Sequence, residues 1–101
     1  MTKSRILYVE DEEVLAMLVR DHLERSGFEV HWTGDGSEAV KLFKEVKPDL
    51  CILDIMLPGI SGYEIGKAIR SLDKTIPIIF LTAKSESKDV VEGFKSGGND
   101  Y

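Results

Sequence analysis

The sequence has little cysteine, no excess of positive charge and no long apolar run, and each shortage excludes a class of protein. One cysteine, Cys51, in 101 residues cannot form an internal disulfide bond, which fits a reducing compartment, by default the cytoplasm. Apolar runs reach about six residues, whereas a membrane-spanning helix needs roughly 20, so no membrane segment is expected. The N-terminal segment breaks its short apolar run with acids, unlike a secretory signal. A formal net charge of -5 argues against direct binding of nucleic acid by this domain.

Apolar and amphipathic blocks alternate along the chain, without a repeat, a low-complexity tract or a linker. Apolar blocks of strand length predict four strands, at residues 5–10, 28–33, 49–54 and 76–82. Amphipathic blocks predict four helices, at residues 12–26, 37–46, 62–72 and 85–97. This alternation favours one α/β domain over residues 1–101, with a parallel sheet covered by helices on both faces.

Polar side chains follow three of the predicted strands at their carboxyl ends. Glu10 and Asp11 follow the first strand, Asp54 ends the third, and Thr82 ends the fourth. Open α/β sheets bind ligands at this edge, so these side chains are expected to share one cleft. Three carboxylates in one cleft raise each other's pKa unless a cation neutralises them. Mg²⁺ is the natural candidate, because it is a hard ion that prefers oxygen ligands.

Asp54 is followed at once by a loop that contains proline and glycine, residues 57–62. Beside a bound cation, its carboxylate can attack an electrophilic phosphorus atom, and the Thr82 hydroxyl can hydrogen-bond a phosphoryl oxygen. The alternative is that the acids cap helices, as Asp11 or Glu12 would at the start of the first helix. Capping explains a single acid at a strand end better than it explains acids at two strand ends with a threonine at a third.

Four motifs, in this order, resemble the receiver domain of two-component response regulators. They are ILYVEDE (6–12), PDLCILDIMLPGISGYE (48–64), IPIIFLTAK (76–84) and GFKSGGNDY (93–101). The segments MLPGISGYE and PIIFLTA are most similar in sequence to receivers of winged-helix transcription regulators. The resemblance implies a flavodoxin-like, three-layer α/β/α fold with a parallel sheet of order 2-1-3-4-5.

The resemblance also assigns roles to the acids of the predicted cleft. It implies that Asp54 is the phosphoacceptor and that Asp11 binds Mg²⁺ directly. Glu10 would act mainly through bound water, and Met56 would offer its backbone carbonyl to the metal.

Three further residues acquire roles from the same resemblance. Thr82 would be the switch hydroxyl that moves toward the phosphoryl group, and Tyr101 the switch aromatic that changes rotamer with it. Met56 and Lys84, two residues beyond Asp54 and Thr82, would tune the lifetime of the phosphoryl group.

The implied function is a phosphorylation-dependent signalling switch. A sensor histidine kinase would donate the phosphoryl group to Asp54, and the face of helix four and strand five would control an output domain of DNA-binding type or another partner. That face, or strand exchange, would also serve a homodimer. The domain would carry only its own autophosphorylation and autodephosphorylation chemistry and would not be an enzyme.

Two alternatives from other classes stay open. The chain can be a receiver-like interaction module that works without phosphate. It can also be an aspartyl-phosphate hydrolase of the haloacid dehalogenase type, although such enzymes usually place a second aspartate two residues after the nucleophile, where this chain has Met56.

The chain departs from the family pattern at its end. Receivers carry a lysine three residues past the switch aromatic, then a fifth helix, whereas this chain stops at Tyr101. We therefore expect that this chain is part of a longer protein, and that strand five and helix five are largely missing from the part given by the sequence. An isolated fragment is expected to be dimeric, strand-swapped or poorly stable, because the fourth strand would be an apolar edge.

Several residues are expected to be structural rather than functional. The first helix places Leu15, Leu18, Val19 and Leu23 at helical spacing, with Gly27 as its stop. Packing roles are predicted for His22, Trp32 and Cys51, and solvated positions for His31, Lys41, Lys44 and Lys47.

Overall fold

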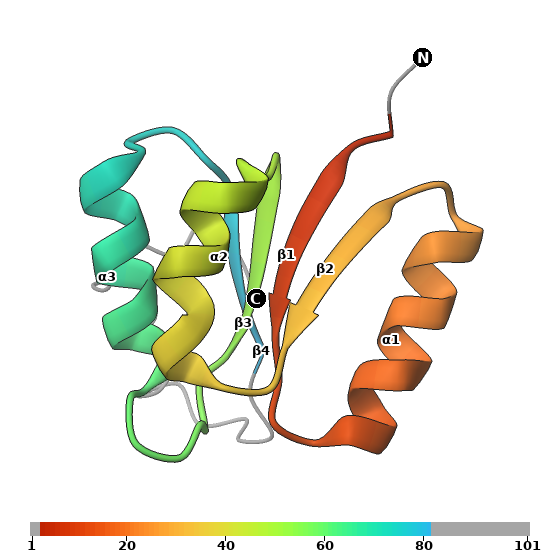
Figure 1. Ribbon diagram of the computed structural model, residues 1–101, viewed down its shortest axis with the longest axis horizontal. Helices are drawn as coiled ribbons and strands as arrows, with labels where there is room; N and C mark the ends of the chain where they lie inside the picture. Colours follow the sequence, from red (N-terminus) through yellow and green to blue (C-terminus); the bar gives the residue numbers. More distant parts are fainter. Residues whose placement is uncertain (1–2, 82–101) are drawn as a thin grey trace.

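The computed structural model describes residues 3–81 and contains the predicted alternation of strands and helices (Figure 1). The elements are β1 (Arg5–Val9), α1 (Glu13–Arg25), β2 (Glu29–Thr33), a 3₁₀ turn η1 (Gly36–Glu38), α2 (Ala39–Val46), β3 (Leu50–Asp54), α3 (Gly62–Leu72) and β4 (Ile78–Leu81). Within residues 3–81, their bounds agree with the sequence prediction to within two residues. The predicted helix 85–97 lies outside the described residues, as do Thr82, Lys84 and Tyr101.

The four strands form one parallel sheet of order β2-β1-β3-β4. This confirms the predicted order as far as the described residues reach, while the predicted fifth strand lies beyond them. β1 is central and pairs with both neighbours, so that Val9 lies beside Thr33 on one side and Leu53 on the other. Because all the pairings are parallel, the carboxyl ends of the strands meet at one edge of the sheet.

Helices cover both faces of the sheet, which gives the three predicted layers (Figure 1). Side chains alternate between the faces along each strand, so in β1 Leu7 and Val9 face α2 and α3, whereas Ile6 and Tyr8 face α1. All four of these β1 side chains are buried. Strands buried on both faces explain why they appear in the sequence as continuous apolar runs.

α1 packs on the sheet through a narrower face than the spacing of its apolar residues predicts. Ala16 is buried, and Val19 and Leu23 pack partly buried against the sheet, whereas Leu15 and Leu18 are 40% and 66% exposed. Successive helical residues turn by about 100°, which puts Leu15 at the margin of the face centred on Ala16 and Leu18 nearly opposite it. In the described part of the chain, no helix is long and apolar enough to cross a membrane.

Most of the other packing predictions are confirmed, and one is wrong. Cys51 is fully buried, and burial raises the pKa of its thiol to about 12, so it is an inert core residue. A packing role was predicted for His22, but this residue is exposed, because it precedes the inward-facing Leu23 and is turned about 100° away from it. Exposed lysines confirm the predicted solvated face of α2: Lys41, Lys44 and Lys47.

Candidate functional site

Three carboxylates meet at the carboxyl edge of the sheet. Glu10 and Asp11 follow β1 directly, and Asp54 is the last residue of the adjacent strand β3. One carboxylate oxygen from each residue lies within 4.8 Å of the others. These three residues, here called the acidic edge, are those that the sequence predicted to share a cleft.

Glu10 is the buried member of the acidic edge, with 2% of its surface exposed. Its Oε2 accepts a hydrogen bond from the Glu12 backbone N–H at 3.3 Å, and its Oε1 accepts one from the Tyr8 hydroxyl at 3.4 Å. Burial, and after it the hydrogen bond and negative charge of Asp54, together raise the pKa of Glu10 from its ordinary 4.5 to about 7. The burial of Tyr8 and the Glu10 charge also raise the pKa of the Tyr8 hydroxyl. Near neutral pH, the site therefore favours a proton or a cation beside Glu10.

Asp54 is held by the loop that follows it. Its Oδ1 accepts a hydrogen bond from the Met56 backbone N–H at 3.0 Å, while the Met56 side chain is 54% exposed. The loop returns to β3 at Gly62, whose N–H donates to the Ile55 carbonyl at 3.2 Å. A side chain at Gly62 would overlap the Asp54 carbonyl oxygen and lie 2.8 Å from its carbonyl carbon, so this approach requires glycine. The loop that follows Asp54 thus folds back beside it.

The structure does not support helix capping as the reason for these acids. Glu12 occupies the N-cap position of α1, but its side chain makes no capping hydrogen bond. Capping side chains are found elsewhere: Ser61 accepts from the Glu64 N–H at the start of α3, and Asp35 accepts from the Ser37 N–H at η1. The acidic edge therefore needs another explanation than helix capping.

An open cavity of about 490 Å³ lies over the acidic edge. Its lining residues come from β3 and β4, from the loops after β1 and β3, and from α1: Glu10, Asp11, Glu12, Leu15, Val19, Asp54, Met56 and Leu81. Mg²⁺ keeps several of its waters when bound by carboxylates, and each water occupies roughly 30 Å³. The cavity therefore has room for a hydrated ion together with a phosphoryl group.

The donor set of this site fits Mg²⁺. All three side chains offer hard carboxylate oxygens, and Asp11 is exposed, which allows a bound ion to keep water ligands. Between residues 3 and 81, no other three acidic, histidine or cysteine side chains come close enough to hold a metal ion. Glu10, Asp11 and Asp54 are therefore the residues that would hold it.

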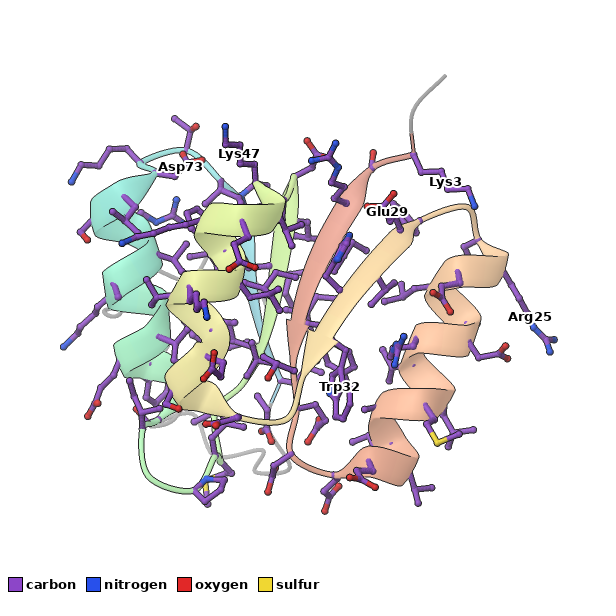
Figure 2. The ribbon with its side chains drawn as sticks, in the orientation of Figure 1. Lys3, Arg25, Glu29, Trp32, Lys47 and Asp73 are labelled. Carbon is purple, nitrogen blue, oxygen red and sulfur yellow. The ribbon has the colours of Figure 1, made fainter. Side chains whose placement is uncertain are left out.

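The sequence did not predict the contacts by which Trp32 and Arg20 support the backbone of Glu10. The Trp32 indole Nε1–H donates to the Glu10 backbone carbonyl at 2.9 Å, and the Arg20 guanidinium carbon lies 5.8 Å from the centre of the Trp32 ring. Figure 2 shows Trp32 at the end of β2, on the side of the sheet that carries α1. The sequence predicted only packing for Trp32, because a hydrogen bond across 22 positions leaves no local pattern.

A parallel α/β domain with carboxylates gathered at the carboxyl ends of β1 and β3 matches a known family. The family described as the response regulator receiver domain matches residues 6–101, and the chain belongs to this family. It is a receiver domain of the two-component type, a family whose members are generally phosphorylation-dependent signalling switches. This confirms the class of protein that the four motifs predict.

Individual relatives agree with this assignment. The transcriptional regulatory protein RprY of Bacteroides fragilis is 43% identical over 99 residues, which cover 98% of this chain and 42% of RprY. The crystal structure of a putative response regulator from Chloroflexus aurantiacus superposes with a TM-score of 0.93 at 36% identity, covering 99% of this chain and 84% of that one. The chain spans about two-fifths of the length of the curated relatives it matches.

One solved relative contains a metal ion. The response regulator TrrA from Thermotoga maritima, in complex with Mg²⁺ and BeF, has a TM-score of 0.87 at 38% identity, and the match covers 97% of this chain and 84% of TrrA. Its complex, together with the acidic edge described above, makes metal binding a property to test in this chain.

Proposed function

We propose that Asp54 accepts a phosphoryl group from a histidine of a sensor kinase, in a reaction that requires Mg²⁺ at the acidic edge. The observation that carries the proposal is the approach of the Glu10, Asp11 and Asp54 carboxylate oxygens to within 4.8 Å of one another. Membership of the receiver family gives this cluster a chemical purpose that the geometry alone does not specify.

The residues of the chain divide the work of the transfer. A carboxylate oxygen of Asp54 forms the new bond to phosphorus as the bond from phosphorus to the kinase histidine nitrogen breaks. The Met56 N–H fixes the orientation of the Asp54 carboxylate before the donor arrives. Bound Mg²⁺ supplies positive charge that offsets the repulsion between the carboxylates and the incoming phosphoryl oxygens. Asp11 is proposed as its direct ligand, Glu10 as a ligand through water, and Met56 as a ligand through its carbonyl.

The response to phosphorylation is proposed to use residues beyond the described part of the chain. Thr82 is the proposed switch hydroxyl, Tyr101 the proposed switch aromatic, and Lys84 a residue that tunes the phosphoryl lifetime with Met56. The name of RprY, a transcriptional regulatory protein, supports a further proposal, that the whole protein regulates transcription. A DNA-binding output domain is proposed to carry out this role. A cytoplasmic location and a homodimer through the helix-four and strand-five face stay predictions.

The test is the intact mass of the chain after incubation with Mg²⁺ and acetyl phosphate. One added phosphoryl group is expected, and Asp54→Asn or EDTA should abolish it. Asp49→Asn is the matched control, because it makes the same change at the opposite end of β3. Its backbone partner, the Arg5 N–H, keeps an acceptor in the asparagine side chain. This control should be phosphorylated like the original chain.

Three results would contradict the proposal. Incorporation that persists in Asp54→Asn would place the acceptor elsewhere. If neither acetyl phosphate nor a sensor kinase phosphorylated the original chain, the interaction module that works without phosphate would be favoured. Turnover of an external phosphate ester would instead favour the hydrolase alternative.

A further inference from the structure

The backbone of Glu10 is fixed to the end of β2 through both its N–H and its carbonyl. The Glu10 N–H donates to the Thr33 carbonyl at 3.1 Å, which continues the pairing of β1 with β2 by one residue. The Glu10 carbonyl oxygen then accepts from the Trp32 indole Nε1–H at 2.9 Å. The second bond is a side-chain contact, so it depends on the presence of an indole at this position.

The indole is itself held in place by its neighbours. The Arg20 guanidinium carbon lies 5.8 Å from the ring centre, from the side of α1, within the range of a cation–π contact. On another side, a Cβ atom added to Gly34 would lie 3.2 Å from Trp32 Cζ2 and 3.4 Å from the Glu10 carbonyl oxygen. The absence of a side chain at Gly34 therefore gives the indole ring the space that it needs to reach the Glu10 carbonyl oxygen.

We infer that Trp32 is a positioning residue for the metal site, acting through the Glu10 carbonyl. The peptide group is planar, so a hydrogen bond to the Glu10 oxygen sets the orientation of the plane from which Asp11 departs. The Asp11 carboxylate is exposed and no hydrogen bond to it is found among the described residues, so its position depends on this backbone. A ligand residue whose backbone is already held in place binds metal more tightly, because it loses less conformational entropy when the ion binds.

The inference rests on the proposed Mg²⁺ site, and it is tested by Mg²⁺ affinity rather than by phosphorylation. Titration of the chain with MgCl₂, followed by ¹H–¹⁵N NMR, gives a dissociation constant for each variant. Trp32→Phe keeps an aromatic ring but removes the N–H donor, and is expected to weaken Mg²⁺ binding about tenfold. Gly34→Ala keeps the indole but crowds it, and is expected to weaken binding in the same direction by a smaller factor.

The matched control is Asp49→Ala, which removes a hydrogen bond to β1 at its opposite end, from the Arg5 N–H at 2.8 Å. It should lower the melting temperature but leave Mg²⁺ affinity within about twofold. In the original chain, the indole N–H resonance of Trp32, the single tryptophan, should shift with the same dissociation constant as the Asp11 amide.

The outcomes separate this inference from the proposed function. Mg²⁺ affinity that is unchanged in Trp32→Phe overturns the positioning role and leaves phosphorylation of Asp54 intact. Equal losses in Trp32→Phe and Asp49→Ala also overturn it, because general loosening of β1 would then explain both. Absence of saturable Mg²⁺ binding in the original chain overturns the inference together with the metal part of the proposed function.

Discussion

The two ends of the parallel sheet differ in whether their charged side chains have partners. At the amino end, Arg5 donates its backbone N–H to Asp49 at 2.8 Å and its Nη1–H to the Val46 carbonyl at 2.7 Å, and its Nε lies 3.8 Å from Glu29. At the carboxyl end, the acidic edge brings three carboxyl groups together, and none of the ion pairs of the described residues reaches them. Figure 2 places Glu29 and Lys47 at the first end and Trp32 at the other.

This difference separates what stabilises the fold from what the fold is used for. Arg5 is the first residue of β1, and Glu10 directly follows its last residue. Arg5 has hydrogen-bond and ion-pair partners, whereas Glu10 is buried beside the like charge of Asp54. Local choices that oppose stability are expected at functional sites, where the missing partner is a ligand. The acidic edge is therefore the end of the sheet whose stability should respond to a cation and to pH.

The largest effect is expected where the backbone closes on the acidic edge. Gly62→Ala places a methyl group against the Asp54 carbonyl and 2.9 Å from the Ile55 Cα atom, and neither backbone group can move without displacing the end of β3. The expected loss is about 3 kcal/mol in the free energy of unfolding, measured by urea denaturation. Mg²⁺ affinity should fall as well, because Asp54 is displaced.

Gly36→Ala is the matched control for this change. Gly36 is also buried, but an added Cβ would meet the side-chain tips of Ile60, Ile65 and Leu57, the nearest at 2.7 Å, and such tips can shift. A loss about half that of Gly62→Ala is expected, with Mg²⁺ affinity unchanged. Equal losses in the two variants would show that the approach of the loop to Asp54 is not the limiting contact.

The second prediction concerns the charge of Glu10 in the metal-free chain. The pKa of Glu10 rises from an ordinary 4.5 to about 7 on folding, so between these pH values the folded state keeps a proton that the unfolded state has released. Rising pH therefore lowers stability across this window, and the full cost remains above pH 7. Glu10→Gln should be more stable than the original chain by about 2 kcal/mol at pH 8 in EDTA, with little difference at pH 4.5. Thermal unfolding at the two pH values measures this gap.

Two further measurements sharpen this result. Added Mg²⁺ should narrow the gap at pH 8, because a bound cation stabilises the original chain more than the variant. Glu12→Gln removes a charge from the exposed neighbouring position and should show no comparable gain. If Glu10→Gln were less stable than the original chain by the same margin at both pH values, burial of the carboxylate would not be the source of the cost.

The contrast between the two ends also explains how much the sequence could reveal. Strand periodicity and the alternation of elements predict the fold, and acids at the ends of two strands predict the members of the acidic edge. Both signals are local, and the parallel arrangement makes their convergence a matter of geometry. Backbone contacts leave no such signal, so the hydrogen bond from Trp32 to Glu10 and the close approach of Gly62 to Asp54 required the structure. The exposure of Leu15 and Leu18 was missed because helical spacing does not define the centre of the packed face.

The smallest effect is expected at the amino end of the sheet. Arg5→Met keeps most of the apolar stem but removes the Nη1–H bond to the Val46 carbonyl and the contact with Glu29, and should lower the free energy of unfolding by about 1 kcal/mol. Arg25→Met is the matched control, because it removes only an exposed ion pair, 3.1 Å from Asp21, and should cost less than about 0.5 kcal/mol. Urea denaturation compares the stabilities of the two variants. In NMR titrations, both variants should bind Mg²⁺ with the same affinity as the original chain. A change in Mg²⁺ affinity in Arg5→Met would mean that the two ends of β1 are coupled, and the separation between a stabilising end and a functional end would then fail.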